Sequence, residues 1–285
     1  MASTSIGIDL ASVDKNRTPK WIDATTVGNV GFVGVRCAYG TLPDDWYPTY
    51  RTQLDALGIP NFPYLFLVPN QATPEDQVNR ALDRLGVLNR SYFPFAIDVE
   101  GDRRGLTPAQ WRSWVVRANE VFRTRYGAPA MIYSSQVYWV DPDGMNNEAA
   151  PELADCTGWW KLWPLPPRSP AIYDPTVVDQ LSPPPTPPPW KGSWQLQQYQ
   201  GDAIKLPGFT STVDMNRVHI VKRGDKGESV KYIQKRLPNI AIDGDFGPLT
   251  ESAVRSFQAN ENVTADGAVG LDTAQLLAWV TPRAA

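Results

Sequence analysis

The sequence has very little histidine and cysteine for its length. Its 285 residues include one histidine, His219, and two cysteines, Cys37 and Cys156. Zinc hydrolases usually take two or three histidine ligands, and triad hydrolases need a histidine beside the nucleophile. We therefore expect no metal centre and no cofactor, and any hydrolytic chemistry should depend on carboxylates. Cys37 lies in the apolar run GFVGVRCAY and is expected to be a buried thiol.

The sequence also lacks long apolar runs and a basic excess. No stretch of about 20 apolar residues occurs, so we expect no membrane insertion. The formal net charge of −3 leaves no basic surplus for phosphates, so no nucleic-acid partner is expected. The start, MASTSIGIDLASVDK, has no basic segment followed by an apolar one, so no signal peptide is expected.

Short β-branched or aromatic runs alternate with helical patterns over the first two thirds of the chain. This alternation predicts an α/β domain with a parallel sheet, open or closed into a barrel. The expected helices are 50–57, 73–88 and 107–126, the last two opened by Thr-Pro caps at Thr73 and Thr107. The expected strands are 5–10, 31–39, 62–68, 93–99, 130–134, 159–163 and 194–200.

Proline is concentrated between residues 151 and 189, which hold 12 of the 27 prolines and the run SPPPTPPP at 182–189. Such a run often marks an interdomain linker, and that interpretation stays open. Because strand-like sequence resumes after it as WQLQQYQ and STVDMNR, we favour a rigid insertion within the first domain. The better boundary is near 218–222, which divides the chain into residues 1–219 and 220–285.

The C-terminal part contains a pseudo-repeat. Asp243-Gly244-x-Phe246-Gly247 recurs as Asp266-Gly267-x-Val269-Gly270, and each glycine-rich turn precedes a helical pattern. Apolar residues at three- to four-residue spacing predict a small three-helix core. Its basic residues could attract an anionic surface or form a solvated helix face: Lys222, Arg223, Lys226, Lys231, Lys235 and Arg236.

The most informative segment for chemistry is FPFAIDVEG at 93–101. Asp98 and Glu100 stand at positions i and i+2 at the end of an apolar strand, so both side chains point to the same face. Active sites of parallel α/β folds lie at this end of the strands. Crowding of two acids should raise the pKa of at least one, which suits a general acid. The alternative is a solvated or salt-bridged strand end.

Two further acids follow the same pattern. Asp9 lies at the end of the first expected strand, and Asp214 lies in the last one. If the sheet closes, the first and last strands are neighbours and all four acids share one rim. A cluster of carboxylates among aromatic residues suits glycosidic bond cleavage.

At these residues the first 219 positions resemble the family-25 glycoside hydrolases, the N-acetylmuramidases often called Chalaropsis-type lysozymes. The matching pieces follow in order along the domain: GIDLAS at 7–12, FVGVRCAYGT at 32–41, FPYLF at 62–66, FAIDVEG at 95–101, MIYSS at 131–135, WQLQQY at 194–199 and VDMNR at 213–217. The resemblance implies an irregular β/α barrel that hydrolyses the β-1,4 bond from N-acetylmuramic acid to N-acetylglucosamine.

The resemblance also implies roles for individual residues. Glu100 matches the general acid/base and Asp98 its partner, while Asp9 and Asp214 match supporting acids of the floor. Groove-lining positions are matched by three residues: Tyr64, Tyr133 and Gln198. The family's tryptophan motif is distorted here as TGWWKLWPLPP, so the resemblance assigns no role to Trp159, Trp160 or Trp163.

The last 60 residues resemble the common three-helix peptidoglycan-binding module. The two resemblances together imply that bacterial peptidoglycan is both the substrate and the ligand of the C-terminal part. We expect a monomeric muramidase, typical of a bacteriophage endolysin that waits in the host cytoplasm for a holin-type pore. Two alternatives remain. One is a non-catalytic wall-binding or virion structural protein with a degenerate barrel. The other is a chitinase-like barrel with a D-x-E pair, which normally has a further Asp where this chain has Ala96.

Overall fold

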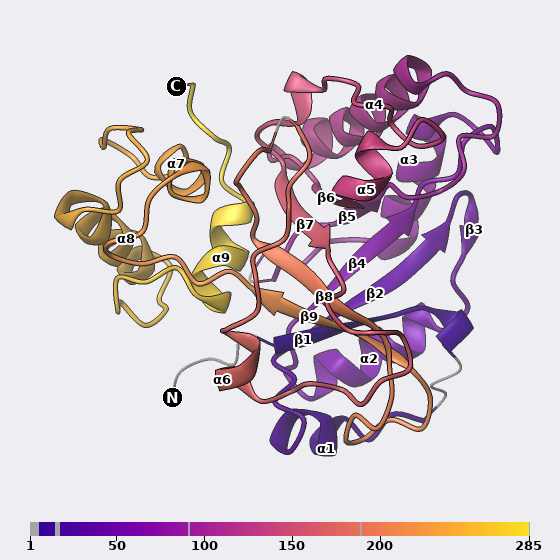
Figure 1. The fold of residues 1–285 in the computed structure, drawn as a ribbon, viewed down its shortest axis with the longest axis horizontal. Coiled ribbons are helices and arrows are strands. Elements are labelled where there is room, and N and C mark those ends of the chain that lie inside the picture. The colour runs from indigo at the N-terminus through magenta and orange to yellow at the C-terminus, as the bar shows by residue number, and fades with distance from the viewer. Residues whose placement is uncertain (1–5, 15–17, 91, 189, 285) are drawn as a thin grey trace.

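The computed structural model describes residues 6–14, 18–90, 92–188 and 190–284, which form a barrel and a helical module (Figure 1). Ser5, where the first expected strand begins, and Pro189, where the proline run ends, lie outside the described residues. So do residues 1–4, on which the expectation about a signal peptide partly rests.

Eight strands close into the expected barrel, in the order β1-β2-β4-β5-β6-β7-β8-β9 and back to β1. The two-residue strand β3, Leu42–Pro43, pairs with the end of β2 outside this ring. The barrel strands are β1 Ile6–Leu10, β2 Phe32–Tyr39, β4 Asn61–Phe66, β5 Ala96–Asp98, β6 Met131–Ser135, β7 Thr157–Lys161, β8 Leu196–Ala203 and β9 Val213–Val218. The expected strand 93–99 is shorter than predicted, because Pro94 has no N–H for the ladder.

The last strand departs from the predicted parallel sheet. β9 runs antiparallel to both β8 and β1, whereas the other pairs in the ring are parallel. The reason lies in the connection: residues 204–212 link β8 to β9 without a helix, and so short a link joins antiparallel strands. As a result, the start of β9 lies at the rim where the parallel strands end.

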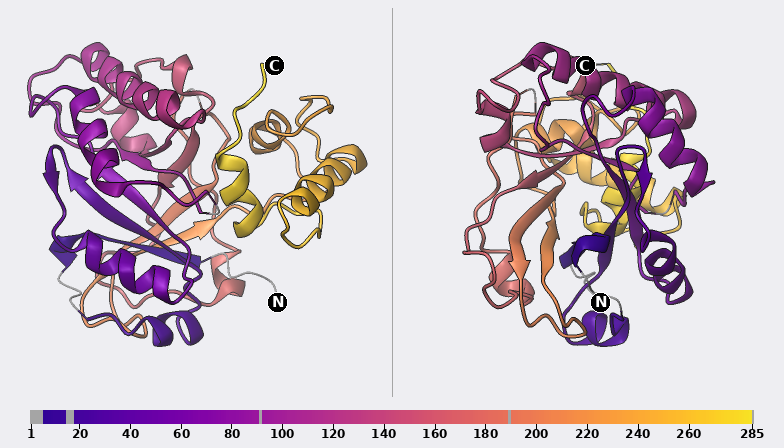
Figure 2. Two further views of the ribbon diagram at one scale, coloured as in Figure 1. Left: turned by 180° about the vertical axis from the view of Figure 1, so that it is seen from behind. Right: turned by 90° about the vertical axis from the view of Figure 1, so that its right-hand side faces the viewer.

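Helices cover most of the outside of the barrel (Figures 1 and 2). They are α1 Trp21–Thr26, α2 Tyr47–Ala56, α3 Pro74–Leu85, α4 Pro108–Tyr126, α5 Gln136–Val140 and α6 Pro175–Val178, with short 3₁₀ turns η1 Ser12–Asp14 and η2 Pro151–Leu153. The predicted caps of α3 and α4 are confirmed: Thr73 Oγ1 accepts the Asp76 N–H, and Thr107 forms a full capping box with Gln110.

The segment between β7 and β8, which contains the proline run, packs on β9 in place of a long helix. Buried Arg217 of β9 holds it: the guanidinium donates to the carbonyl oxygens of Val178, Leu181 and Ser182 at 2.7–3.1 Å. These bonds tie the backbone of the segment to the strand. The chain then returns to the barrel as β8.

The C-terminal module consists of α7 Glu228–Gln234, α8 Pro248–Asn260 and α9 Leu271–Ala278, as predicted. Its pseudo-repeat extends to side-chain contacts. Gln234 donates to Asp243 Oδ1 and accepts the Gly244 N–H, and Gln258 does the same with Asp266 and Gly267. In each copy a buried glutamine therefore holds the aspartate-glycine turn that follows its helix.

The module packs against the end of the barrel where the parallel strands begin. Thr157, the first residue of β7, shares a buried 2.7 Å hydrogen bond with Tyr232 of α7. Trp279 donates to the Tyr92 carbonyl oxygen and packs edge-on against Tyr126. One buried apolar cluster continues from Phe32 and other barrel residues into the helices of the module. Barrel and module thus share a core.

Candidate active site

The structure gathers the seven predicted site residues around one cavity of about 190 Å³, here called the carboxylate cavity. It opens at the rim where the parallel strands end. Its lining includes all of them: Asp9, Tyr64, Asp98, Glu100, Tyr133, Gln198 and Asp214. Sequence analysis had placed the four acids on one rim if the sheet closed, and the closed sheet brings them together.

Asp9 and Asp214 meet because β1 and β9 are neighbours. Their Cα atoms are register partners in the antiparallel β1–β9 pair. Burial raises the pKa of Asp9 well above its ordinary value, and the nearby Asp214 raises it further. Burial likewise raises the pKa of Asp214 to about 7, although the Asp202 N–H that it accepts opposes the shift. This part of the cavity therefore favours protonated carboxyls.

Gln198 of β8 connects the two acids to the aromatic wall. Its Oε1 atom accepts hydrogen bonds from Tyr133 Oη at 2.8 Å and from Trp163 Nε1 at 2.9 Å. Its Nε2 atom donates to Asp9 Oδ1 at 2.9 Å and to Asp214 Oδ2 at 3.2 Å. With both ends of the amide bonded, the side chain has one orientation, and it fixes the positions of the two carboxyls.

Asp98 and Glu100 have different surroundings although only Val99 lies between them. β5 ends at Asp98, so Glu100 lies just beyond the strand and not within it. Asp98 is buried, and its Oδ1 atom has no hydrogen-bond partner among the described residues. Burial and the Glu100 carboxylate raise the pKa of Asp98 well above its usual range. Glu100 is partly exposed and forms an ion pair with Lys161 at 2.5 Å.

Sequence reasoning missed several residues of this rim. Trp159 lines the carboxylate cavity and donates to Asn216 Oδ1 at 2.7 Å, while Asn216 donates to Asp9 at 2.7 Å. Lys161 follows Trp159 at i+2 in β7, so the two share the inward face. A lysine on the inward face of an apolar strand was the available signal, but the distorted tryptophan motif hid it.

Arg36 and Asp14 were also missed, and both line the carboxylate cavity. Arg36 pairs with buried Asp44 at 3.0 Å, so its charge already has a partner. Burial raises the pKa of Asp14 to about 6. The lone basic residue of the run GFVGVRCAY was the signal for Arg36.

A second cavity of about 450 Å³, here called the side cavity, adjoins the first. It is lined by Glu100, Ser135, Val137, Tyr138, Asp141, Lys161, Leu162 and Trp163. Glu100 is the one described residue that lines both cavities. The Glu100 carboxyl group therefore lies at the junction of the carboxylate cavity and the side cavity. Trp163 forms an exposed aromatic wall of the side cavity, which is the larger of the two.

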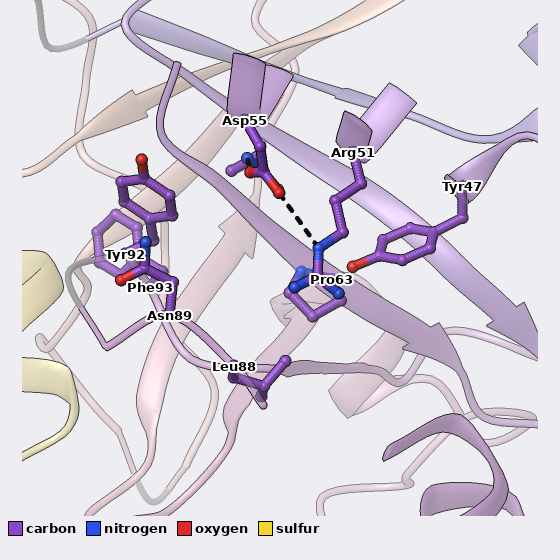
Figure 3. A pocket seen from close by; sticks show the side chains of 9 residues that line it. Tyr47, Arg51, Asp55, Pro63, Leu88, Asn89, Tyr92 and Phe93 are labelled. Atoms are coloured by element: carbon purple, nitrogen blue, oxygen red, sulfur yellow. Dashed lines mark hydrogen bonds and ion pairs between the residues drawn. The ribbon is translucent and has the colours of Figure 1, made fainter. Parts of the chain in front are cut away.

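A third cavity, of about 300 Å³, lies near the start of β4, away from the carboxylate rim (Figure 3). Three of its polar groups interact with one another: Arg51 Nε forms an ion pair with Asp55 Oδ2 at 3.5 Å, and Asn61 donates to Asp55 at 2.8 Å. Among the described residues that line it, Asp55 is the one carboxylate. Paired acids for glycoside chemistry are found at the other rim.

Comparison with known families decides what this site belongs to. Residues 8–174 match the model of glycosyl hydrolases family 25, which covers more than half of the chain. The chain belongs to glycosyl hydrolases family 25. Residues 226–277 of this family-25 glycoside hydrolase match a peptidoglycan binding domain. The expected enzyme class and the expected type of module are confirmed.

Solved structures of family-25 type share the fold of the barrel. A bacterial lysozyme from Streptomyces coelicolor is 19% identical, with a TM-score of 0.61 over 77% of this chain and 94% of that one. A family GH25 lysozyme from Aspergillus fumigatus is 17% identical, with a TM-score of 0.59 over 75% and 93%. The catalytic domain of an endolysin from bacteriophage P40 of Listeria monocytogenes is 17% identical, with a TM-score of 0.55 over 76% and 93%.

A curated relative matches a shorter part of the family-25 chain. A zinc D-Ala-D-Ala carboxypeptidase from Streptomyces albus G is 39% identical over 57 residues, which are 18% of this chain and 22% of that protein. The chain thus spans about a fifth of the length of the curated relative that it matches. Within the described ranges, no group of three or more His, Cys, Asp or Glu side chains is arranged to hold a metal ion.

Helix length and hydropathy address the expectation about membranes. In the part of the chain that the structure describes, no helix is both long and apolar enough to cross a bilayer.

Proposed function

We propose that the protein is a lysozyme that cleaves the β-1,4 bond from N-acetylmuramic acid to N-acetylglucosamine in peptidoglycan. The position of Glu100 carries this proposal, because this residue lines both the carboxylate cavity and the side cavity. A glycan that occupies both cavities has one glycosidic bond beside the Glu100 carboxyl. Glycoside hydrolysis requires a proton donor at that position.

In the proposed reaction the protonated Glu100 gives its proton to the glycosidic oxygen of the leaving N-acetylglucosamine. The acetamido carbonyl oxygen of the muramic acid attacks C1 as the C1–oxygen bond breaks, which forms a cyclic oxazolinium. A water molecule then attacks C1, the acetamido oxygen leaves, and Glu100 takes the proton of the water. Two inversions at C1 give net retention.

Asp98 fits the role of the partner that holds the acetamido group. Its Oδ1 atom is a buried acceptor with no donor among the described residues, and an acetamido N–H would supply one. The positive charge that develops on the oxazolinium stabilises the ionised carboxylate. This offsets the burial that raises the pKa of Asp98.

The remaining predicted residues fit substrate positioning. Gln198 holds Asp9 and Asp214 with one amide nitrogen, so the three present fixed polar atoms to sugar hydroxyls. Burial raises the pKa values of Tyr64 and Tyr133 well above their ordinary range, so both phenols stay neutral beside the acids.

We assign wall binding to residues 220–285 and catalysis to residues 1–219. Two observations support this division. β9 ends at Val218, and His219 donates its backbone N–H to Gln195 of the barrel at 2.8 Å. Val221 instead pairs with Val269 of the module. His219 also stacks on Trp194 at 4.1 Å between ring centroids, which supports a packing role at the junction.

The experiment is an analysis of the chain ends that the protein creates in purified peptidoglycan. After digestion and borohydride reduction, a muramidase leaves muramitol, whereas cleavage of the other glycosidic bond leaves glucosaminitol. We expect muramitol from the wild type and none from Glu100→Gln, which should still bind walls. If the wild type creates no reducing ends but sediments with walls, the non-catalytic wall-binding alternative is correct.

We further propose that the protein acts as a monomer and serves as a bacteriophage lysin released through a holin-type pore. All seven predicted site residues line one cavity within a single chain, so the proposed reaction needs no residue from a second copy. Likeness of the barrel to the catalytic domain of a bacteriophage endolysin supports the lysin role. Expression in a susceptible bacterium should cause lysis only when a pore-forming protein is coexpressed. Lysis without the pore would contradict the release route.

A further inference from the structure

Lys161 is the feature of the active site that the proposed reaction does not use. Its Nζ atom lies 2.5 Å from Glu100 Oε2, and each side chain is 27% exposed. The pair is therefore within reach of solvent and of a bound ligand. The ammonium thus occupies Glu100 Oε2, whereas a general acid needs a carboxyl oxygen that can carry a proton to the glycosidic oxygen.

From the same position, Lys161 also contacts an aromatic ring. Its ammonium lies 5.1 Å from the centroid of the Trp163 ring, a cation–π distance, and both residues line the side cavity. Asp141 lines the same cavity. A flexible lysine stem can move its head group from Glu100 into this cavity without a change in the backbone.

The other charged groups around the Lys161–Glu100 pair are mostly acidic. Arg36, the cation on the opposite wall of the carboxylate cavity, already pairs with Asp44. The acidic and phenolic groups that face the two cavities from the surrounding elements are Asp9, Asp14, Tyr64, Asp98, Tyr133, Tyr138, Asp141 and Asp214. Among the residues that the structure describes, Glu100 thus has one ion-pair partner, Lys161, in a site that otherwise crowds acids.

We propose that Lys161 is a positioning residue that leaves Glu100 when a carboxylate of the lactyl-peptide arm of muramic acid enters the side cavity. This inference rests on the proposed muramidase function. The substrate carboxylate takes over the ammonium, and Glu100 can then accept the proton that it gives to the leaving oxygen. The enzyme is therefore more active when an anionic substrate arm is present, which favours acidic peptidoglycan over neutral glycans.

The test compares walls with native carboxylates, walls whose carboxylates are amidated, and peptide-free glycan strands that keep the lactyl carboxylate. For the wild type we expect kcat/KM to fall about five- to tenfold on amidated walls. Lys161→Met should cleave native and amidated walls at equal rates, and Lys161→Arg should restore the preference. If peptide-free strands are cleaved as well as native walls, the free lactyl carboxylate can replace the peptide carboxylate as the partner. If peptide-free strands are cleaved as slowly as amidated walls, the carboxylate that pairs with Lys161 belongs to the peptide.

The pH profile gives a readout that a merely structural lysine would not move. Removal of the ammonium should shift the basic limb of kcat/KM to higher pH in Lys161→Met, because proton loss from the acid becomes less favourable. Arg80→Met is the matched control, since Arg80 forms a 2.9 Å ion pair with Asp76 on the barrel helix α3 and lines neither of the two cavities. That control should change neither the substrate preference nor the profile.

Two results would overturn the inference while the proposed function stands: equal cleavage of native and amidated walls by the wild type, or the same preference in Lys161→Met. Should Lys161→Met fail to fold by circular dichroism, the amidation arm with wild type and Lys161→Arg still decides. Failure of the muramidase proposal itself looks different, because the wild type would then create no muramic acid ends on any substrate.

Discussion

The two ends of the barrel differ in what they bury. At the end where the parallel strands finish, the chain buries carboxyls: Asp9 and Asp98 are 7% and 5% exposed. At the other end it buries apolar rings, and the core continues from Phe32 and Phe62 into the module. Buried acids oppose folding at neutral pH, and buried rings favour it. One end is thus arranged for chemistry, and the other stabilises the fold.

The module is part of the stabilising end and not a loosely tethered anchor. Tyr232 is buried against Thr157, and Arg236, only 3% exposed, lies over the Tyr232 ring and donates to the Asp155 carbonyl oxygen. The helices of the module that is assigned to wall binding therefore also stabilise the barrel. The comparison also predicts that substitutions at the two ends have opposite effects on stability.

After Glu100→Gln, the largest expected effect is on catalysis, in Asp98→Asn. Loss of the charge that holds and stabilises the acetamido group should lower kcat about 10²–10³-fold. The measurement is the initial rate of reducing-end release from purified peptidoglycan, with wall binding as the control. A loss of less than threefold would remove Asp98 from the reaction.

At the other end, Tyr232→Ala should lower the free energy of unfolding by about 3 kcal/mol, because it deletes a buried ring and leaves Thr157 without its partner. Urea unfolding followed by circular dichroism gives this value, and kcat on soluble fragments should stay within twofold. Leu249→Ala, at an exposed position of α8, is the control and should change little. Because the core is shared, we expect one unfolding transition; two separate transitions would contradict the comparison.

The smallest expected effect is a gain of stability, about 1 kcal/mol, in Asp98→Asn at neutral pH. Burial raises the pKa of Asp98 in the folded state, so the folded protein binds the proton more tightly than the unfolded chain does. The stability of the wild type therefore falls as pH rises above the ordinary aspartate value of about 3.9.

Asp98→Asn has no carboxyl at position 98 and does not lose stability in this way. The difference in stability between this variant and the wild type should therefore be absent near pH 3.5 and should grow as pH rises toward 8. Thermal unfolding of both proteins over that range measures it. His219, whose pKa burial lowers, contributes equally to both proteins and cancels in the difference. An advantage that does not vary with pH would contradict the electrostatic explanation.

The sequence predicts the functional residues of the catalytic end better than the contacts of the stabilising end, and the reason is physical. Strand periodicity and position at strand ends are local signals, and they were enough for Asp9, Asp98 and Glu100. Contacts between distant segments leave no such signal. Arg236, considered as part of a charged surface or a solvated face, is buried against the barrel. Most of the other basic side chains of that set are ion-paired, among them Arg223 with Glu251 and Lys231 with Glu228.

Two further departures follow from the same limit. The direction of β9 depends on the connection that precedes it, which a strand pattern does not report. The Lys161–Glu100 pair depends on the pairing of β7 within the barrel, which places residue 161 opposite a loop 61 positions earlier. The first feature required the connection before β9 to be known, and the second required the closed sheet.

The central claim is that Glu100, at the junction of the two cavities, is the proton donor. The most direct test is the rate of muramic acid reducing-end release by Glu100→Gln compared with the wild type, at matched unfolding temperature. The account predicts a loss of at least about 10³-fold, with wall binding and thermal unfolding unchanged. A variant that keeps more than a tenth of the wild-type rate would contradict it.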